Sequence, residues 1–193
     1  FPVSFSYYDN FFYVGYSDGN IISFDKSGII KWKIDYSDIL KTPLKIHNDQ
    51  IIVLLSNQIL SLDAKNGSLN WQYIYNNENV LQSKGGDVVG LNNLLFFILP
   101  NNMTGEVDTI FGEKNRSIFS DINLKNLINN SDDSLYSYKD NLSYFDQKKY
   151  LTTVNISNNK LLLNAEKITD VKSAKFINNA LIVMNSYGFL QAI

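Results

Sequence analysis

The sequence predicts an all-β fold, a β-propeller built from four-stranded antiparallel blades. Short apolar runs rich in β-branched residues alternate with tight-turn signals, and one such pattern recurs along the chain. The repeat has a period of roughly 40 to 45 residues with several short strands per copy, which is typical of propeller blades. About five copies are present and the fifth stops within a strand, so we expect part of a larger ring of seven or eight blades.

The clearest copy spans residues 51–71, IIVLLSNQILSLDAKNGSLNW. It contains two apolar runs separated by a polar break, then Asp63, a glycine turn and a third strand that ends at Trp71. The pair Asn66-Gly67 supplies the positive φ of a tight turn, because glycine has no Cβ to clash there. Trp71 can bury a large area on this strand while its indole N–H stays hydrogen-bonded. The copy therefore predicts a strand, turn, strand, turn, strand unit.

The same order of residues recurs along the chain. An upstream copy spans residues 12–32 and places Asp25, Gly28 and Trp32 in equivalent positions. Weaker copies span residues 94–119 and 142–163, and a fifth begins at Ala180. We take as equivalent corners residues 25, 63, 112 and 155, with Phe119 and Leu163 in place of Trp in the weaker copies.

A second marker adds a fourth strand to each unit, because an acidic or amide pair closes a short strand before each hairpin. The pairs are Asp9-Asn10, Asn48-Asp49, Asn92-Asn93, Asp140-Asn141 and Asn178-Asn179. The predicted blades cover residues 1–36, 37–75, 85–121, 134–166 and 172–193, the last of them incomplete. In the first strand, Val3, Phe5 and Tyr7 alternate with serines, which predicts a half-buried inner strand.

One segment departs from the strand pattern. Residues 121–134, DINLKNLINNSDDS, have the apolar spacing of a short helix with Asp121 as its cap. Two interpretations stay open for it. It is either an insertion between blades or a recognition element, since long loops often carry function.

Composition excludes several classes of function. A net charge of −2 gives no basic field, so we expect no nucleic-acid partner. The absence of cysteine removes disulfides, thiolate nucleophiles and zinc fingers. No apolar run approaches the 18 or so residues that a membrane-spanning helix needs, so we expect no direct membrane span.

The sequence predicts no catalytic, cofactor-binding or metal-binding residue. His47 is the sole histidine, and a general base needs an orienting partner and a substrate within reach, so we interpret it as a turn residue. The aspartates at 35, 38, 132 and 133 lack the spacing of a calcium loop, and solvated surface charge is the simpler interpretation. We therefore expect a protein that is not an enzyme and takes no cofactor.

The runs DGNIISFDKSGIIKW (18–32) and ILSLDAKNGSLNW (59–71) resemble the repeat of PQQ-like (quinoprotein-type) β-propellers. Blades of that family end in a strand, Asp-Ala-x-x-Gly, a strand and Trp. The resemblance covers nearly the whole chain, strongly in the first two units and by pattern in the rest. It implies that the Trp and the glycine turn dock neighbouring blades onto one another.

Within that family the chain is most similar to the propeller lipoprotein of the bacterial outer-membrane β-barrel assembly machinery. This similarity implies a non-catalytic protein-binding scaffold of the cell envelope. It also implies a periplasmic location at the inner face of the outer membrane, β-barrel assembly components as partners, and a lipid anchor outside this segment.

Two alternatives stay open from the same resemblance. One is a fragment of a PQQ-dependent dehydrogenase, a class in which a carboxylate-held calcium, a catalytic Asp and a vicinal disulfide surround the quinone. This chain has no cysteine, and we find no matching acidic cluster in its sequence. The other is the stress-sensing luminal domain of an endoplasmic-reticulum kinase, whose sequence also resembles these repeats.

Overall fold

A computed structural model describes residues 1–75, 86–99, 104–113, 135–145, 150–157, 160–167, 171–177 and 180–193. Every regular element among these residues is a β-strand, which confirms the all-β prediction. The strands form five antiparallel sheets that follow one another in chain order. Over the same ranges there is no helix with the length and apolar character needed to cross a membrane.

Each sheet is a simple meander of consecutive strands. The first contains β1 (Pro2–Tyr8), β2 (Phe11–Tyr16), β3 (Asn20–Asp25) and β4 (Ile30–Asp35). The second contains β5 (Lys45–His47), β6 (Gln50–Leu54), β7 (Gln58–Asp63) and β8 (Leu69–Ile74). The third contains β9 (Asp87–Leu91), β10 (Leu94–Ile98) and β11 (Thr104–Asp108). The fourth contains β12 (Leu135–Tyr138), β13 (Asn141–Phe145), β14 (Tyr150–Asn155) and β15 (Lys160–Lys167). The fifth contains β16 (Val171–Ile177), β17 (Ala180–Asn185) and β18 (Leu190–Ala192).

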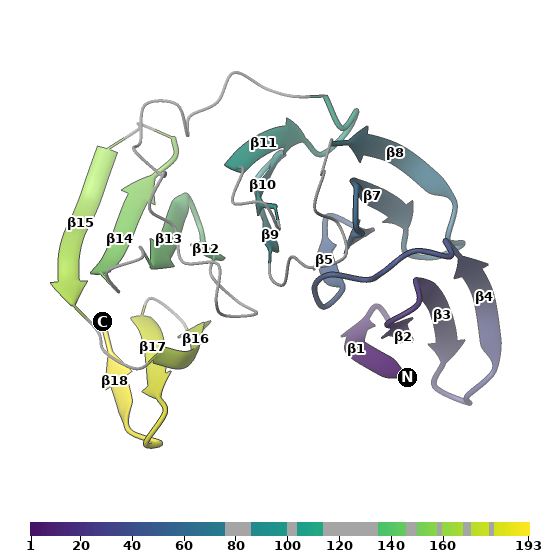
Figure 1. Ribbon diagram of the computed structural model, residues 1–193, viewed down its shortest axis with the longest axis horizontal. Coiled ribbons are helices and arrows are strands. Elements are labelled where there is room, and N and C mark those ends of the chain that lie inside the picture. The colour runs from purple at the N-terminus through teal and green to yellow at the C-terminus, as the bar shows by residue number, and fades with distance from the viewer. Residues whose placement is uncertain are drawn as a thin grey trace.

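The five sheets are arranged as an arc around a common centre (Figure 1). The first strand of each sheet lies nearest the centre, and the inner strands β1, β5, β9, β12 and β16 contact one another in that order. The outer strands β4, β8 and β15 lie on the rim. The first and fifth sheets stand at the two ends of the arc.

Two-residue turns join the inner strand of a sheet to its second strand. Asp9 and Asn10 have φ of 45° and 71°, and Asn48 and Asp49 have φ of 49° and 59°. Asp and Asn tolerate this left-handed region, and such turns match the twist of a hairpin. The structure confirms the predicted turn pairs in the first three sheets. In the fourth sheet the turn is one residue earlier than predicted, at 139–140, because residue 141 begins β13, and the pair 178–179 lies outside the described residues.

The turns between the third and fourth strands begin with a carboxylate that caps the chain. Asp63 Oδ1 accepts hydrogen bonds from the backbone N–H groups of Lys65 and Asn66, at 2.9 and 3.0 Å. Asp25 also caps its turn in the first sheet, but this turn is one residue shorter, and the carboxylate accepts from the N–H groups of Ser27 and Ile29 at 2.8 and 3.0 Å. Side chains of Asp favour this local bonding over continued strand pairing.

In the third sheet the predicted corner at residue 112 is wrong. The capping residue is Asp108, whose Oδ1 accepts from the N–H groups of Ile110 and Phe111 at 2.7 and 3.0 Å. Gly112 has φ of 68° and takes the place of Gly67, not of Asp63. Two exposed apolar residues in the turn, at 110 and 111, hide the corner from a search for polar turn residues.

The fourth sheet keeps the predicted corner at Asn155. Asn155 pairs with Asn141 as Asp63 pairs with Gln50. The strand register also places Leu163 opposite Thr153, the relation that Trp71 has to Ser61. Residue 119 and the predicted helix at 121–134 lie outside the described residues.

Apolar clusters fill the spaces between successive sheets, and Ile51, Val53 and Leu62 between the first two are wholly buried. The first strand is half-buried as predicted, and the buried face is the one that carries the serines. Ser4 is buried and its Oγ accepts from the Leu44 N–H at 2.8 Å, whereas the apolar side chains of β1 are exposed. The serine face of β1 lies against the second sheet, and the apolar face points away from it.

Candidate interaction surfaces

The second and third sheets are joined by Trp71 of β8. The Trp71 indole Nε1 donates a hydrogen bond to the carbonyl oxygen of Thr109 at 2.8 Å, and the side chain is 6% exposed. Gln50 Nε2 donates to the same oxygen at 3.0 Å. A Cβ added to Gly112 would lie 2.6 Å from the indole, so this contact requires glycine.

The first and second sheets are joined in the same way by Trp32 of β4. Its Nε1 donates to the carbonyl oxygen of Ala64 at 3.2 Å, and the Tyr13 hydroxyl donates to that oxygen at 3.1 Å. A Cβ on Gly67 would lie 2.8 Å from the Trp32 ring. Burial raises the pKa of Tyr13 to about 12. Each indole of an outer strand therefore docks on the corner turn of the next sheet, the docking role that the resemblance implied.

Polar side chains connect the two-residue turns along one face of the arc. The Tyr8 hydroxyl donates to Asp49, and Asn92 Nδ2 donates to Asp140 Oδ1 at 2.9 Å. His47 lies at the end of β5, where its Nε2 is 2.8 Å from the carbonyl oxygen of Asn92. Its ring covers Gly90 so closely that a Cβ there would overlap it. The histidine predicted to be a turn residue therefore helps to join the second and third sheets.

A buried carboxylate ties three inner strands together. Asp87 at the start of β9 is fully buried, and its Oδ2 accepts from the backbone N–H of Leu135 on β12 at 2.9 Å. Lys45 Nζ on β5 lies 3.4 Å from Asp87 Oδ1. Buried carboxylates are costly unless paired and hydrogen-bonded, so this group fixes the second, third and fourth sheets relative to one another.

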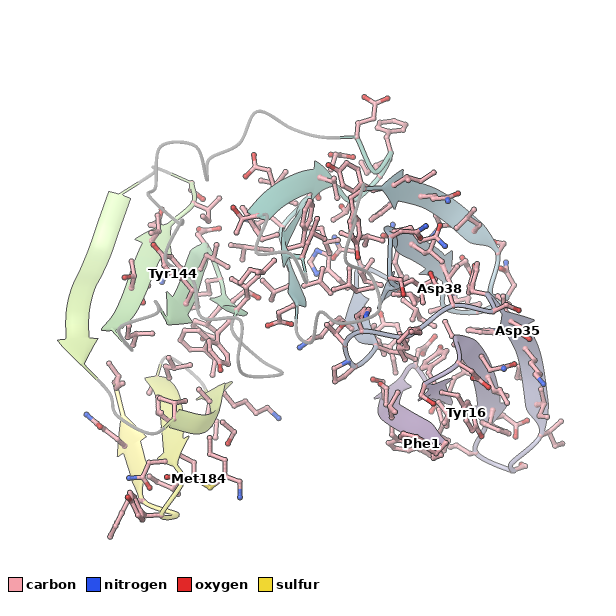
Figure 2. The ribbon with its side chains drawn as sticks, in the orientation of Figure 1. Phe1, Tyr16, Asp35, Asp38, Tyr144 and Met184 are labelled. Carbon is pink, nitrogen blue, oxygen red and sulfur yellow. The ribbon has the colours of Figure 1, made fainter. Side chains whose placement is uncertain are left out.

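A hollow of about 580 Å³ opens on the opposite face, where the β2–β3 turn meets the linker to the second sheet. Its lining residues are Asp18, Asn20, Asp35, Ser37, Asp38, Ile39 and Ser56. Figure 2 shows Asp35 and Asp38 between the first two sheets. Each carboxylate accepts from a nearby backbone N–H, as Asp35 does from Ser37 at 2.8 Å. A hydrogen bond from Asn20 lowers the pKa of Asp18, so this carboxylate keeps its charge at neutral pH.

A smaller hollow of about 140 Å³ lies on the turn face between the first two sheets. It is lined by Tyr8, Asp9, Tyr13, Asp49, Asp63, Ala64 and Lys65. The side-chain hydrogen bond to Asp49 raises the pKa of Tyr8. Within the ranges that the structure describes, no group of three or more His, Cys, Asp or Glu side chains is placed to hold a metal ion.

Two of the three carboxylates of the larger hollow were predicted from the sequence as surface charge, but the hollow itself was not predicted. Asp35 and Asp38 were predicted to be solvated surface charge, and the structure brings them to one rim with Asp18. The local signal was present, because Asp18 and Asp35 each precede by two residues the backbone N–H that they accept from. Their convergence depends on how the linker packs on the β2–β3 turn, which no local signal encodes. The predicted surface charges at 132 and 133 lie outside the described residues.

No family model matches the sequence, and no curated protein matches it either. Solved structures do share its fold. BamB from Moraxella catarrhalis has a TM-score of 0.68 at 16% identity, over 95% of this chain and 57% of that one. The computationally designed Ika8 protein has a TM-score of 0.72 at 13% identity, over 99% of this chain and 57% of that one.

The Cps50 (Swd1) β-propeller domain of Myceliophteria thermophila has a TM-score of 0.72 at 12% identity, over 99% of this chain and 64% of that one. This chain thus spans about three fifths of the length of these structures. At sequence identities of 12–16%, the similarity to these structures shows a shared fold and nothing more. It confirms the fold predicted from the sequence: the five sheets are blades of a β-propeller.

Proposed function

We propose that the protein is a non-catalytic scaffold of the bacterial cell envelope, which holds other envelope proteins on the loop faces of its propeller. The location that goes with this proposal is the periplasm, at the inner face of the outer membrane, with β-barrel assembly components as partners. Two observations support the proposal. The repeats at 18–32 and 59–71 resemble those of PQQ-like β-propellers, and the chain shares its fold with BamB.

The observation that carries the proposal is the rigid connection between the blades. Trp32 and Trp71 are each buried against a corner turn of the next sheet, and both indole N–H groups are hydrogen-bonded. A scaffold works by fixing the positions of its loops, because pre-ordered contacts lower the entropic cost of binding. The interlocked sheets supply this rigidity to both loop faces.

The larger hollow is the part of the surface that we assign to a partner. Its three carboxylates, on Asp18, Asp35 and Asp38, lie beside the apolar side chain of Ile39, which is 38% exposed. Burial lowers the pKa of the neighbouring Lys41, and the charge of Asp38 opposes that shift. An acidic rim around an apolar contact suits a basic segment of a partner, with charge attraction raising the rate of encounter.

Site-specific photo-cross-linking in living cells tests this function. A photoreactive side chain at position 39 should capture envelope proteins, and one at position 65, on the turn face, serves as the matched control. Mass spectrometry identifies the captured proteins. Recovery of β-barrel assembly components at position 39 supports the proposal, and recovery of none at either position contradicts it.

A set of charge variants then tests the role of the hollow. The triple variant D18N/D35N/D38N removes the charge and leaves an oxygen that can cap each turn. The matched triple variant D9N/D49N/D63N does the same around the smaller hollow on the turn face. We expect cross-linking from position 39 to fall several-fold in the first variant and to persist in the second. Equal cross-linking yields in the two variants would show that the partner does not depend on the charge of the larger hollow, and would contradict its assignment as the binding surface.

A further inference from the structure

The corner turn of the third sheet carries two large apolar side chains in the open. Ile110 is 57% exposed and Phe111 is 70% exposed, and this apolar pair forms the tip of the turn that follows β11. The turn lies on the same face of the arc as the two-residue turns, because the Thr109 N–H donates to the carbonyl oxygen of Asn93 at 2.9 Å. The apolar pair is therefore on the face opposite the larger hollow.

The fold does not require apolar residues at these two positions. The corner turn of the second sheet has the same length and the same cap, since Asp63 and Asp108 each accept from the N–H groups two and three residues later. In the second sheet the two positions hold Lys65 and Asn66, both exposed. A polar pair thus fits the same backbone, so the stability of the turn does not account for the apolar pair.

The backbone beneath the apolar pair is fixed by the second sheet. Trp71 Nε1 and Gln50 Nε2 both donate to the carbonyl oxygen of Thr109, and β8 and the end of β11 lie side by side (Figure 1). The Gly112 N–H donates to the carbonyl oxygen of Asp108 at 2.9 Å, and the Trp71 ring covers Gly112. Large apolar side chains on a rigid support lose little conformational entropy on binding, which is typical of interface hot spots.

Acidic groups stand on both sides of the apolar pair. Asp108 begins the turn and the exposed Glu113 ends it, and the Asp108 N–H donates to the Glu113 carbonyl oxygen at 2.9 Å. Among the residues that the structure describes, neither carboxylate forms an ion pair. An apolar contact between two negative charges is complementary to an apolar pocket with basic groups at its rim, and it disfavours an anionic lipid surface.

We propose that the apolar pair is the docking site of a second partner protein, which receives Phe111 and Ile110 in an apolar pocket rimmed by Lys or Arg. This inference rests on the scaffold role proposed above and adds a binding surface on the other face. Two surfaces on opposite faces would allow the propeller to hold two proteins at once.

Photo-cross-linking from position 110, in the cells that make the protein, tests this site. A photoreactive aromatic side chain replaces Ile110, and position 65, the equivalent place in the turn of the second sheet, is the matched control. We expect position 110 to capture one protein several-fold more efficiently than position 65. Mass spectrometry of the cross-linked peptide should locate the contact in a segment that combines apolar residues with Lys or Arg.

Several results would overturn the proposal. They are a yield at position 110 no higher than at position 65, a cross-link to phospholipid, a cross-link to a second copy of this chain, and a cross-link to a segment without basic residues. Cross-linking from position 39 in the same cells separates the two proposals. Recovery of assembly components there, with no capture at position 110, would refute the second docking site and leave the proposed function standing.

Two variants that carry the same probe test the chemistry of the contact. Phe111→Asn installs the residue that the equivalent turn already holds, so it should leave the melting temperature unchanged and lower the yield from position 110 several-fold. Glu113→Gln removes one charge and keeps the backbone carbonyl group, and should lower the yield by a smaller factor. An unchanged yield in the first variant would overturn the docking site, and an unchanged yield in the second would overturn the basic rim of the pocket.

Discussion

At the scale of single residues, each indole has two roles that other side chains do not combine. The Trp71 ring fills the space above Gly112, and its N–H satisfies a carbonyl oxygen that the turn removes from water. Thr109 is 2% exposed, so its carbonyl oxygen is buried. Without the indole N–H, this oxygen would keep one hydrogen bond, from Gln50. Loss of the N–H and loss of the ring should therefore have separable costs.

Substitution of Trp71 separates these two costs. Trp71→Phe keeps an aromatic ring and removes the donor, and should lower the free energy of unfolding by about 1–2 kcal/mol. Trp71→Ala also opens a cavity, and should cost about 3–5 kcal/mol. Urea unfolding of the two variants measures both values. Equal losses would show that the ring contributes nothing beyond its hydrogen bond.

Tyr13 makes stability depend on alkaline pH. Its pKa is about 12 in the folded protein against about 10 in an unfolded chain, so folding favours the protonated phenol. This contribution is complete below pH 10 and is lost as the pH rises from about 10 to 12. Tyr13→Phe should be less stable than the parent at pH 8 and should lose less stability above pH 10.

Urea unfolding of parent and Tyr13→Phe at several pH values between 8 and 11 measures this dependence. Tyr75, whose pKa burial also raises, remains in both proteins and gives them a shared alkaline loss. A difference between the two proteins that stays constant across this range would contradict the assignment to Tyr13.

At the scale of elements, inner strands are held by polar bonds as well as by apolar packing. Asp87 receives the Leu135 N–H and the charge of Lys45 in a fully buried position. By contrast, Lys31 and Asp25 form an exposed pair at 2.9 Å on β4 and its turn. Loss of a partner from the buried pair leaves a buried charge unpaired, so we expect that pair to contribute more to stability than the exposed one.

Asp87→Asn should lower the free energy of unfolding by about 3 kcal/mol, because it removes the charge and turns an amide donor toward another N–H group. The control Lys31→Gln removes the exposed pair and should cost less than about 1 kcal/mol. Chemical unfolding of the two variants, side by side, gives the comparison. A cost for Asp87→Asn no greater than that of the control would show that the buried link is not needed.

The elements themselves were largely predictable, because strands and tight turns are local features. Asn48-Asp49 and Asn66-Gly67 carry their turn chemistry in the sequence, and the structure places both where the pattern predicts. The corner at Asp108 was missed because apolar residues follow it. The alternation on β1 predicted a half-buried strand but not its buried face, because alternation defines two faces and does not say which one a neighbouring sheet covers.

At the scale of the whole molecule, one directional contact joins the first sheet to the second and the second to the third. The outer strand of one sheet supplies an indole, and the corner turn of the next receives it. The repeat period indicated the propeller, but the acidic hollow of Asp18, Asp35 and Asp38 could not be foreseen, because it forms where a linker crosses a turn. Convergence of distant residues is a property of packing, and no local pattern specifies it.

Three identical substitutions test the directional contact most directly. Gly67, Gly112 and Gly188 have similar positive φ of 75°, 68° and 86°, so alanine carries the same backbone penalty of about 1 kcal/mol at each. A Cβ would strike an indole at the first two positions and would meet nothing within 4 Å at Gly188.

The measurement is the free energy of urea unfolding of Gly67→Ala, Gly112→Ala and Gly188→Ala. We predict losses of about 3 kcal/mol for each of the first two variants, since overpacking adds to the backbone penalty, and about 1 kcal/mol for the third. Equal losses at all three positions would contradict the account, because the blades would then not be joined through tryptophan and glycine.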